Sequence, residues 1–265
     1  SKSLGNVISA KKAMNDHGAD VIRLWVAATD YRGDLAVSDE ILKRTSDAYR
    51  RIRNTARFLL ANLNGFKVTR DLLSTENLLA LDRWVIYEAK VLQEEIIQAY
   101  ESYQFHHIYH RLHNFCSLEL GGFYLDIIKD RQYTTAANSK ARRSAQTAMY
   151  HIIQALSRWI APILSHTAEE IWEHIPCEKL SSVFLSEWYA GFDSEDLANS
   201  DFKMNSNFWQ EIMEVRTAVY REIENQRNSG NLRSSLDAQV TLFASPRLHH
   251  ILSELGDELR FVLIT

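Results

Sequence analysis

The chain has 265 residues, enough for one large or two modest domains, and its composition, 46% hydrophobic and 24% charged, is that of a soluble globular protein. It has no stretch of 18 apolar residues and opens without a signal peptide, which argues against a membrane or secreted protein and favours the cytoplasm. The two cysteines lie far apart without a Cys-x-x-Cys pair, so neither a disulfide framework nor a zinc site is expected.

The net charge of -4 does not by itself suggest nucleic-acid binding, but the charge is unevenly distributed. Residues 1–60 hold 11 Lys and Arg against 7 Asp and Glu, a local excess of +4. Because a polyanion binds to a local patch rather than to the sum of all charges, this part of the chain is the first place to look for one.

The scarcity of turn residues, with only 9 Gly and 3 Pro, favours long helices over an all-β fold. Ser9 is placed to cap a short helix that Gly18 ends, and residues 19–29 follow as a second helix. Ser38 caps a long helix over residues 39–63, whose apolar residues recur at helical spacing. The same spacing predicts further helices over residues 79–103, 105–129, 140–160, 167–174, 208–227 and 248–255.

The remaining segments are less regular. Thr167 and Glu170 have the spacing of a capping box at the start of the 167–174 helix. Residues 176–207 lose periodicity and read as an irregular connection, whereas residues 238–244 and 259–264 resemble strands. The predicted fold is therefore mainly α, with a partial α+β module at the end. Because the chain starts at Ser1 and stops within an apolar run, we expect it to be part of something longer.

The helix over residues 39–63 carries a basic stripe. At 100° per residue, Lys43, Arg50, Arg53 and Arg57 fall within one narrow band beside the apolar seam, and Arg44 and Arg51 flank the other side. Acidic residues stop after Asp47, so Arg50, Arg53 and Arg57 have no carboxylate four residues away on this helix. The stripe is suited to phosphate groups; the alternatives are a solvated basic face or packing onto acidic neighbours.

A second basic cluster lies at a predicted helix–helix corner. Arg142 and Arg143 are accompanied in sequence by Lys129, Arg131 and Lys140. This cluster is either a further phosphate-binding surface or an exposed charged turn.

Two residue types invite other functions. His106, His110 and His113 share a helix face at i, i+4 and i+7, but no carboxylate or cysteine with ligand spacing completes a metal site, so a half-exposed polar flank is expected and no metal is predicted. Most tryptophans stand at core spacing. The pair Trp188-Tyr189 in the irregular connection is the exception and could stack on unpaired bases.

Several ordered segments carry a family resemblance. Ser1-Lys2-Ser3-Leu4-Gly5-Asn6 resembles the end of the Lys-Met-Ser-Lys-Ser loop of class I aminoacyl-tRNA synthetases, and the segment Gly18-Ala19-Asp20-Val21-Ile22-Arg23-Leu24-Trp25 resembles the one that follows it. The runs over residues 49–63 and 123–133 resemble bacterial isoleucyl-tRNA synthetases rather than their valyl or leucyl relatives. The first Lys-Met of the loop is absent. The resemblance covers essentially the whole chain.

The resemblance implies a division of the chain into three parts. Residues 1–38 would be the end of the catalytic loop and a connecting module, residues 39–234 the anticodon-binding helix bundle, and residues 235–265 the start of the C-terminal module. Ser1, Lys2 and Ser3 would belong to the ATP-binding loop, where Lys2 stabilises the pyrophosphate leaving group in the parent enzyme.

The same resemblance implies the partner. The parent would join isoleucine to its tRNA with ATP and Mg²⁺, and would carry a zinc module outside this chain. This region, without a cofactor of its own and not catalytic alone, would bind isoleucine-accepting tRNA as a monomer, and neither DNA nor a membrane. The residues expected to contact tRNA are Lys43, Arg44, Arg50, Arg51, Arg53, Arg57, Arg131, Arg142 and Arg143. The alternatives are the same region of a valyl- or leucyl-tRNA synthetase, or a helical protein–protein interaction module.

Overall fold

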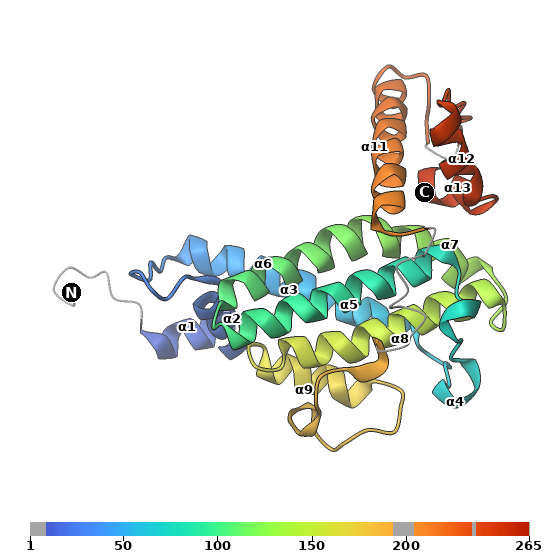
Figure 1. Cartoon of the computed structure of the whole chain (residues 1–265). Coiled ribbons are helices and arrows are strands. Elements are labelled where there is room, and N and C mark those ends of the chain that lie inside the picture. Colours follow the sequence, from blue (N-terminus) through green and yellow to red (C-terminus); the bar gives the residue numbers. More distant parts are fainter. Residues whose placement is uncertain (1–8, 193–203, 235–236, 265) are drawn as a thin grey trace.

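The structure, a computed structural model, describes residues 9–192, 204–234 and 237–264. Long helices run side by side in a bundle, with the N-terminal helices at one end and a smaller helical unit at the other (Figure 1). The elements of the bundle and its N-terminal extension are α1 (Ala10–His17), α2 (Ala19–Ala28), α3 (Asp39–Asn62), α4 (Val68–Asp71), α5 (Ala80–Glu101), α6 (Phe105–Asn114), the π-helical segment η3 (Phe115–Tyr124), α7 (Leu125–Thr134), α8 (Lys140–Ile160) and α9 (Ser165–His174).

The helix starts follow the local sequence. Ser9 accepts a hydrogen bond from the backbone N–H of Lys12, and Ser38 accepts one from that of Ile41, as predicted for N-caps. Gly18 ends α1 with a φ of 89°, a conformation in which an L side chain would be strained. The helical bundle predicted from apolar spacing is thus confirmed.

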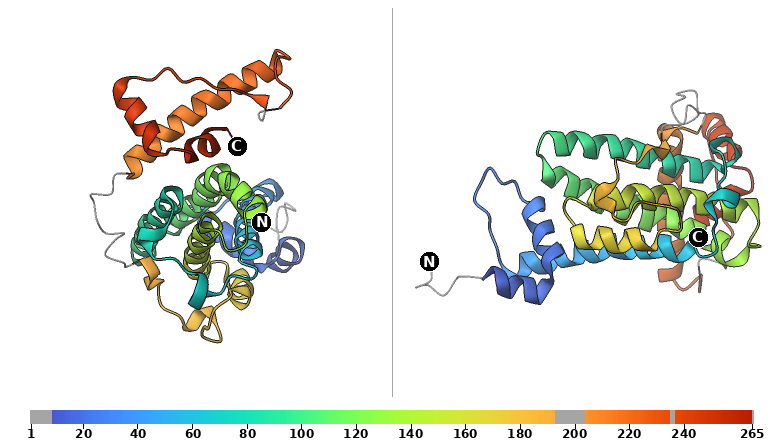
Figure 2. Two further views of the ribbon diagram at one scale, coloured as in Figure 1. Left: turned by 90° about the vertical axis from the view of Figure 1, so that its right-hand side faces the viewer. Right: turned by 90° about the horizontal axis from the view of Figure 1, so that it is seen from below.

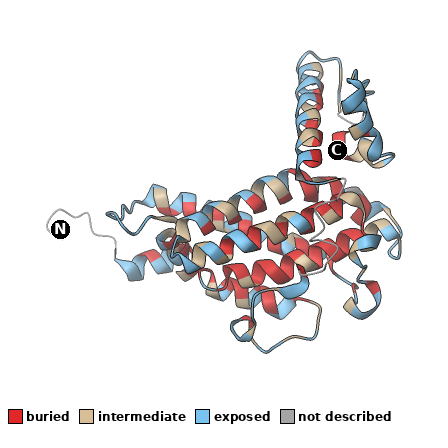
Figure 3. Ribbon diagram, viewed as in Figure 1, coloured by how far each residue is buried: buried red, intermediate tan, exposed pale blue. Residues whose placement is uncertain are grey.

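Helix α8 is the central element of the bundle. From Ser144 to Ile160 every residue is buried except His151 and Arg158, because α3, α5, α7 and α9 all pack against it. The view down the bundle axis shows α8 enclosed by its neighbours (Figure 2), and the buried residues gather along the inner faces (Figure 3). Burial on several sides means that the polar residues of α8, such as Ser144, Gln146 and Thr147, are buried as well as its apolar ones.

The polar side chains inside α8 are used to hold the connection between α3 and α5. Ser144 accepts a hydrogen bond from the N–H of Leu79 at 2.8 Å, and Thr147 accepts one from that of Leu73 at 3.1 Å. The amide of Gln146 donates to the carbonyl of Asn62 at 2.8 Å. Each of these three buried side chains therefore has a backbone partner, which offsets the cost of burying it.

The smaller unit consists of α11 (Ser206–Asn228), α12 (Pro246–Glu254) and α13 (Glu258–Ile264). Helix α11 rises away from the bundle, and α13 packs along it (Figure 1). Its base is anchored by the fully buried Trp209, whose ring lies 5.6 Å from that of Trp84 in α5. This aromatic contact attaches the unit to the bundle.

Both predicted strands are wrong, since the described part of the chain contains none. Residues 259–264 lie in α13, where Val262 and Leu263 are buried against the unit; an apolar run this short does not distinguish a strand from a buried helix. Among the described residues, no strand lies beside residues 238–244 to supply ladder hydrogen bonds, and Phe243 is 98% exposed.

The predicted capping box at Thr167 is also wrong. Helix α9 begins earlier, at Ser165, so Thr167 lies within its first turn. The hydroxyl of Thr167 donates to Asp20, and Glu170 pairs with Arg53 on α3. Both residues therefore serve contacts between helices rather than a local cap. Of the helices in the described ranges, none combines the length and apolarity needed to cross a bilayer.

Candidate nucleic-acid interface

The outer face of α3 carries six of the basic residues that the sequence predicted to contact tRNA. Leu42, Ala48, Ile52, Ala56 and Leu59 turn into the core, which leaves the opposite side of the helix to solvent. Five of the six predicted basic residues of α3 are exposed and one is half-buried. The exposed ones are Lys43, Arg44, Arg50, Arg51 and Arg57, and the half-buried one is Arg53.

Two of these exposed arginines have local carboxylate partners. Arg44 binds Glu40 at 2.5 Å and Arg50 binds Asp47 at 3.0 Å, each within one turn of α3. The prediction that Arg50 has no acidic partner considered only a spacing of four residues, and Asp47 stands three residues away. Exposed pairs of this kind contribute about 0.2–1 kcal/mol and exchange partners readily.

Arg53 has a stronger attachment. Its guanidinium binds Glu170 of α9 through two parallel hydrogen bonds of 2.7 and 2.5 Å, a bidentate pair between residues 117 positions apart. These bonds lower the pKa of Glu170 and raise that of Arg53. The prediction that Arg53 lacks a partner is wrong, because the packing of α9 beside α3 cannot be read from the helix alone. Its position indicates that it fastens α3 to α9.

Three cations of α3 have no carboxylate within ion-pair distance in the described ranges. They are Lys43, Arg51 and Arg57, all exposed. Lys43 and Arg57 lie 14 residues apart on nearly the same face, which places them about 21 Å apart along the helix axis. A rigid helix thus presents separated positive charges to one side of the bundle.

The members of the second predicted basic cluster differ in burial: Arg131 is buried, whereas Arg142 and Arg143 are partly exposed. Arg131 is only 5% exposed and pairs with the fully buried Asp82 at 3.4 Å and with Glu258. The prediction that Arg131 contacts tRNA is therefore wrong: its charge neutralises a buried carboxylate. Burial raises the pKa of Asp82, and Arg131, Ser144 and Tyr124 oppose that rise by stabilising the carboxylate.

The neighbouring arginines differ from Arg131. Arg143 lies 3.4 Å from Asp71 and donates to Gln146 at 2.7 Å, with its side chain 14% exposed. Arg142 is half-buried and has no ion-pair partner among the residues that the structure describes. Arg142 is thus the member of this cluster that remains suited to a phosphate.

The pair predicted to stack on unpaired bases, Trp188-Tyr189, packs against side chains of the bundle. Trp188 is 40% exposed, but its ring packs on Tyr100 with 5.8 Å between centroids. The hydroxyl of Tyr189 lies 2.7 Å from Nδ1 of His151 on α8. Both rings therefore already have protein partners. In the described part of the chain, no three histidine, cysteine or acidic side chains converge as a metal site would require.

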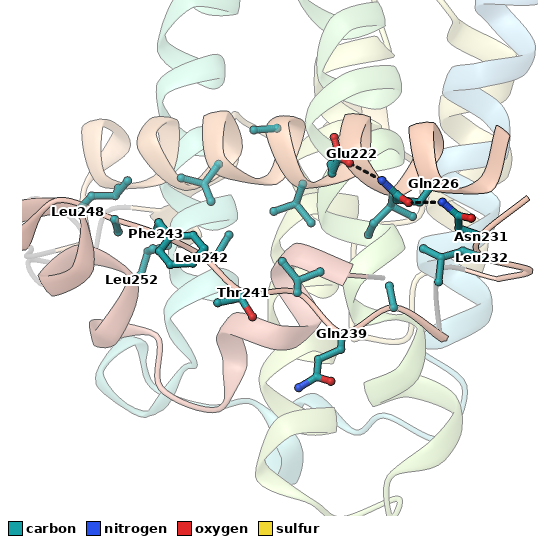
Figure 4. Close-up of a pocket in the computed structure, with 17 residues that line it drawn as sticks. Glu222, Gln226, Asn231, Leu232, Gln239, Thr241, Leu242, Phe243, Leu248 and Leu252 are labelled. Carbon is teal, nitrogen blue, oxygen red and sulfur yellow. Dashed lines mark hydrogen bonds between the residues drawn. The ribbon is translucent and has the colours of Figure 1, made fainter. Parts of the chain in front are cut away.

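An apolar groove of about 570 Å³ lies between α11, α12 and two short segments, residues 231–232 and 238–244. Its polar edge holds Gln226, which donates to Glu222 at 2.7 Å and accepts from Asn231 at 2.8 Å, and Leu242, Leu248 and Leu252 lie along it (Figure 4). None of the predicted basic residues lines this groove, so it is not a phosphate-binding surface.

The comparisons with known proteins agree with this arrangement of helices and charge. Residues 82–242, more than half of the chain, match the model for the anticodon-binding domain of tRNA ligase, and residues 1–38 match that for class I tRNA synthetases (I, L, M and V). The chain therefore belongs to the family of tRNA-ligase anticodon-binding domains.

The relatives narrow the comparison further. The chain is 59% identical to the isoleucine–tRNA ligase of Thioalkalivibrio sulfidiphilus, 58% to that of Azotobacter vinelandii and 57% to that of Halorhodospira halophila, in each case over its whole length. It spans 28% of the length of each of these relatives. Ser1, Lys2 and Ser3, predicted for the ATP-binding loop, lie outside the described residues, and their roles stay predictions.

Proposed function

We propose that this chain is the tRNA-binding region of an ATP-dependent isoleucine–tRNA ligase of the cytoplasm. The observation that carries the proposal is a set of exposed cations on the rigid helix α3 that have no carboxylate partner within residues 9–192, 204–234 and 237–264, in a domain of the anticodon-binding family. Such cations position RNA by neutralising phosphates, whereas base contacts supply specificity. ATP with Mg²⁺ would serve the parent enzyme, and a zinc module would lie outside this chain.

The proposed phosphate contacts involve fewer residues than the sequence predicted. The first choice is Lys43, Arg51, Arg57 and Arg142, because among the described residues they have no ion pair to break. Arg44 and Arg50 would have to leave Glu40 and Asp47 to reach a phosphate, so we expect less from them.

The organisation proposed for the chain follows from these assignments. Residues 1–38 would connect to the catalytic domain, residues 39–234 would bind the anticodon arm, and residues 235–265 would start the C-terminal module. The relatives support isoleucine over valine or leucine, since each is an isoleucine–tRNA ligase. We propose that the unit acts as a monomer.

A pair of substitutions on one helix tests the proposal. Arg57→Ala removes a free cation, so it should weaken tRNA binding about equally for different tRNAs and flatten the slope of log affinity against log salt by roughly 0.7–0.9. Arg53→Ala is the matched control, because it removes the same charge four residues earlier from a side chain held by Glu170. It should lower thermal stability and leave the slope nearly unchanged.

The competing function, a helical protein-interaction module, predicts another outcome. Without phosphate contacts, binding of tRNA would be weak and neither variant would alter its salt slope. A flat salt dependence for the unmodified protein would therefore overturn the proposal. Equal loss of slope in both variants would instead show that Arg53 leaves Glu170 when RNA binds.

A further inference from the structure

Asp20 and Arg23 of α2 reach both helix ends at the corner between α8 and α9. The carboxylate of Asp20 accepts hydrogen bonds from the N–H of Thr167 at 2.8 Å, from its hydroxyl at 2.6 Å and from the N–H of His166 at 3.4 Å. The guanidinium of Arg23 donates to the carbonyls of Ile163 at 2.8 Å and Pro162 at 2.7 Å. All of these partners lie about 140 residues away in sequence.

The charges match the electrostatics of the two helix ends. The N–H groups in the first turn of α9 have no partner within the helix. The N-cap position is Leu164, whose side chain cannot accept a hydrogen bond. Asp20 therefore caps α9 from another helix and places a negative charge at the positive end of its dipole. Arg23 places a positive charge beside carbonyls that follow the C-terminal end of α8, where the dipole is negative.

The geometry fixes orientation as well as contact. Asp20 and Arg23 stand three residues apart, so they project from one face of α2 about one turn apart. The Asp20 contact is buried, with Asp20 6% and Thr167 2% exposed, and the Thr167 hydroxyl lies 2.9 Å from that of Tyr49 on α3. Two anchored points on one helix prevent it from swivelling about either one, so α2 has a defined angle to the bundle.

The position of this contact in the chain gives it a functional meaning. Residues 1–38 match the model for class I synthetases, whereas residues 82–242 match that for the anticodon-binding domain. The Asp20 and Arg23 contacts therefore join the two matched regions. They cross from one to the other through a few directed hydrogen bonds rather than through an extended apolar surface alone.

We propose that Asp20 and Arg23 are positioning residues that set the angle between the catalytic side of the ligase and its anticodon-binding bundle. The inference rests on the proposed function. When a tRNA is bound at its anticodon, its acceptor end reaches the distant active site only if this angle is correct. Small misplacements far from the chemistry lower rates by up to about a hundredfold. Neither residue touches the reacting atoms.

The experiment uses the full-length ligase and separates amino-acid activation from tRNA charging. Asp20→Ala removes the cap, Asp20→Asn keeps an oxygen that still accepts hydrogen bonds, and Arg23→Gln removes the guanidinium. Asp30→Ala is the matched control, because Asp30 forms an ion pair with the exposed Arg32 just beyond α2 and with no other side chain in the part of the chain that the structure describes. Each variant is assayed for isoleucine-dependent pyrophosphate exchange, for charging of whole tRNA, and for charging of an acceptor-stem minihelix that lacks the anticodon.

The expected result is a selective defect. Asp20→Ala and Arg23→Gln should lower kcat/KM for whole tRNA by about tenfold or more, with Asp20→Asn in between, while exchange and minihelix charging stay within about twofold of the unmodified enzyme. Asp30→Ala should change none of the three. A uniform loss in all assays would indicate a folding defect and overturn the proposal, as would unchanged charging of whole tRNA. Absence of isoleucine-dependent exchange in the unmodified enzyme would instead overturn the proposed function itself.

Discussion

Replacing Arg131 with Met tests the reassignment of this residue from the tRNA surface to the core. In the folded chain Arg131 neutralises Asp82, which is fully buried and also accepts hydrogen bonds from Tyr124 at 2.7 Å and Ser144 at 2.5 Å. Methionine fills most of the volume but leaves the carboxylate without its counter-charge. Breaking a buried pair in this way costs about 3–5 kcal/mol.

The structure sets a ceiling on that cost. Without Arg131, Asp82 can avoid a buried negative charge by binding a proton. The free energy of protonating a carboxyl with the ordinary pKa of 3.8 rises by about 1.4 kcal/mol for each pH unit above 3.8, which gives about 4 kcal/mol at neutral pH. Burial already raises the folded-state pKa of Asp82 in the unmodified protein, and loss of Arg131, which opposes that rise, raises this pKa further while the unfolded-state pKa is unchanged. Its native state binds the extra proton, so stability falls as pH rises above 3.8. The deficit relative to the unmodified protein should therefore be largest at neutral pH and shrink on acidification.

Urea unfolding over a pH series measures both the size and the sign of this effect. The double variant Asp82→Asn, Arg131→Met is the control, because it carries neither charge and should lose the extra pH dependence. A deficit that does not shrink on acidification would refute the reasoning. A variant of normal stability with a flattened tRNA salt slope would restore Arg131 to the RNA-binding surface.

Three further expectations follow from the structure. Burial lowers the pKa of His151 from 6.5 to about 4, so the unfolded chain binds this proton at a higher pH than the folded chain does. Between about pH 7.5 and 4.5 the difference removes about 2.5 kcal/mol from the free energy of unfolding. Urea unfolding of His151→Gln should lack this loss. Cys116 is 2% exposed and burial raises the pKa of its thiol to about 12, so thiol titration of the folded chain should modify Cys177 and reach Cys116 only after unfolding. Lys2→Ala in the full-length ligase should slow isoleucine activation by about 10²–10³, and an unchanged exchange rate would exclude Lys2 from the mechanism.

The sequence predicted what depends on local periodicity. The apolar seam of α3 and its Ser38 cap both follow from spacing within one helix, and both are present. The same reasoning separated the core tryptophans, such as Trp159 and Trp209, from Trp188, which is partly exposed. The long helices were found because a stripe of buried residues over several turns leaves a clear pattern.

What the sequence could not predict depends on contacts between distant elements. Arg53 and Arg57 look alike on a helical projection, yet only Arg53 meets Glu170, which α9 brings beside α3. Arg131 reads as one member of a basic cluster, and its burial depends on where α5 places Asp82. The signal that could have raised doubt about Arg131 was Asp82 itself, an acidic residue within an apolar helix face that needs a buried counter-charge.

The hydrogen bonds from α8 to the connection between α3 and α5 limit how that surface segment can change in length. Surface loops generally tolerate insertions and deletions. Here the carbonyl of Asn62 and the amides of Leu73 and Leu79 are bound at set points by α8, so the segment is attached to the bundle at three places. An insertion between Leu73 and Leu79 would have to extend into solvent, whereas a deletion that brings the two amides closer would pull one of them from its buried partner, so related proteins should lengthen this segment more readily than shorten it.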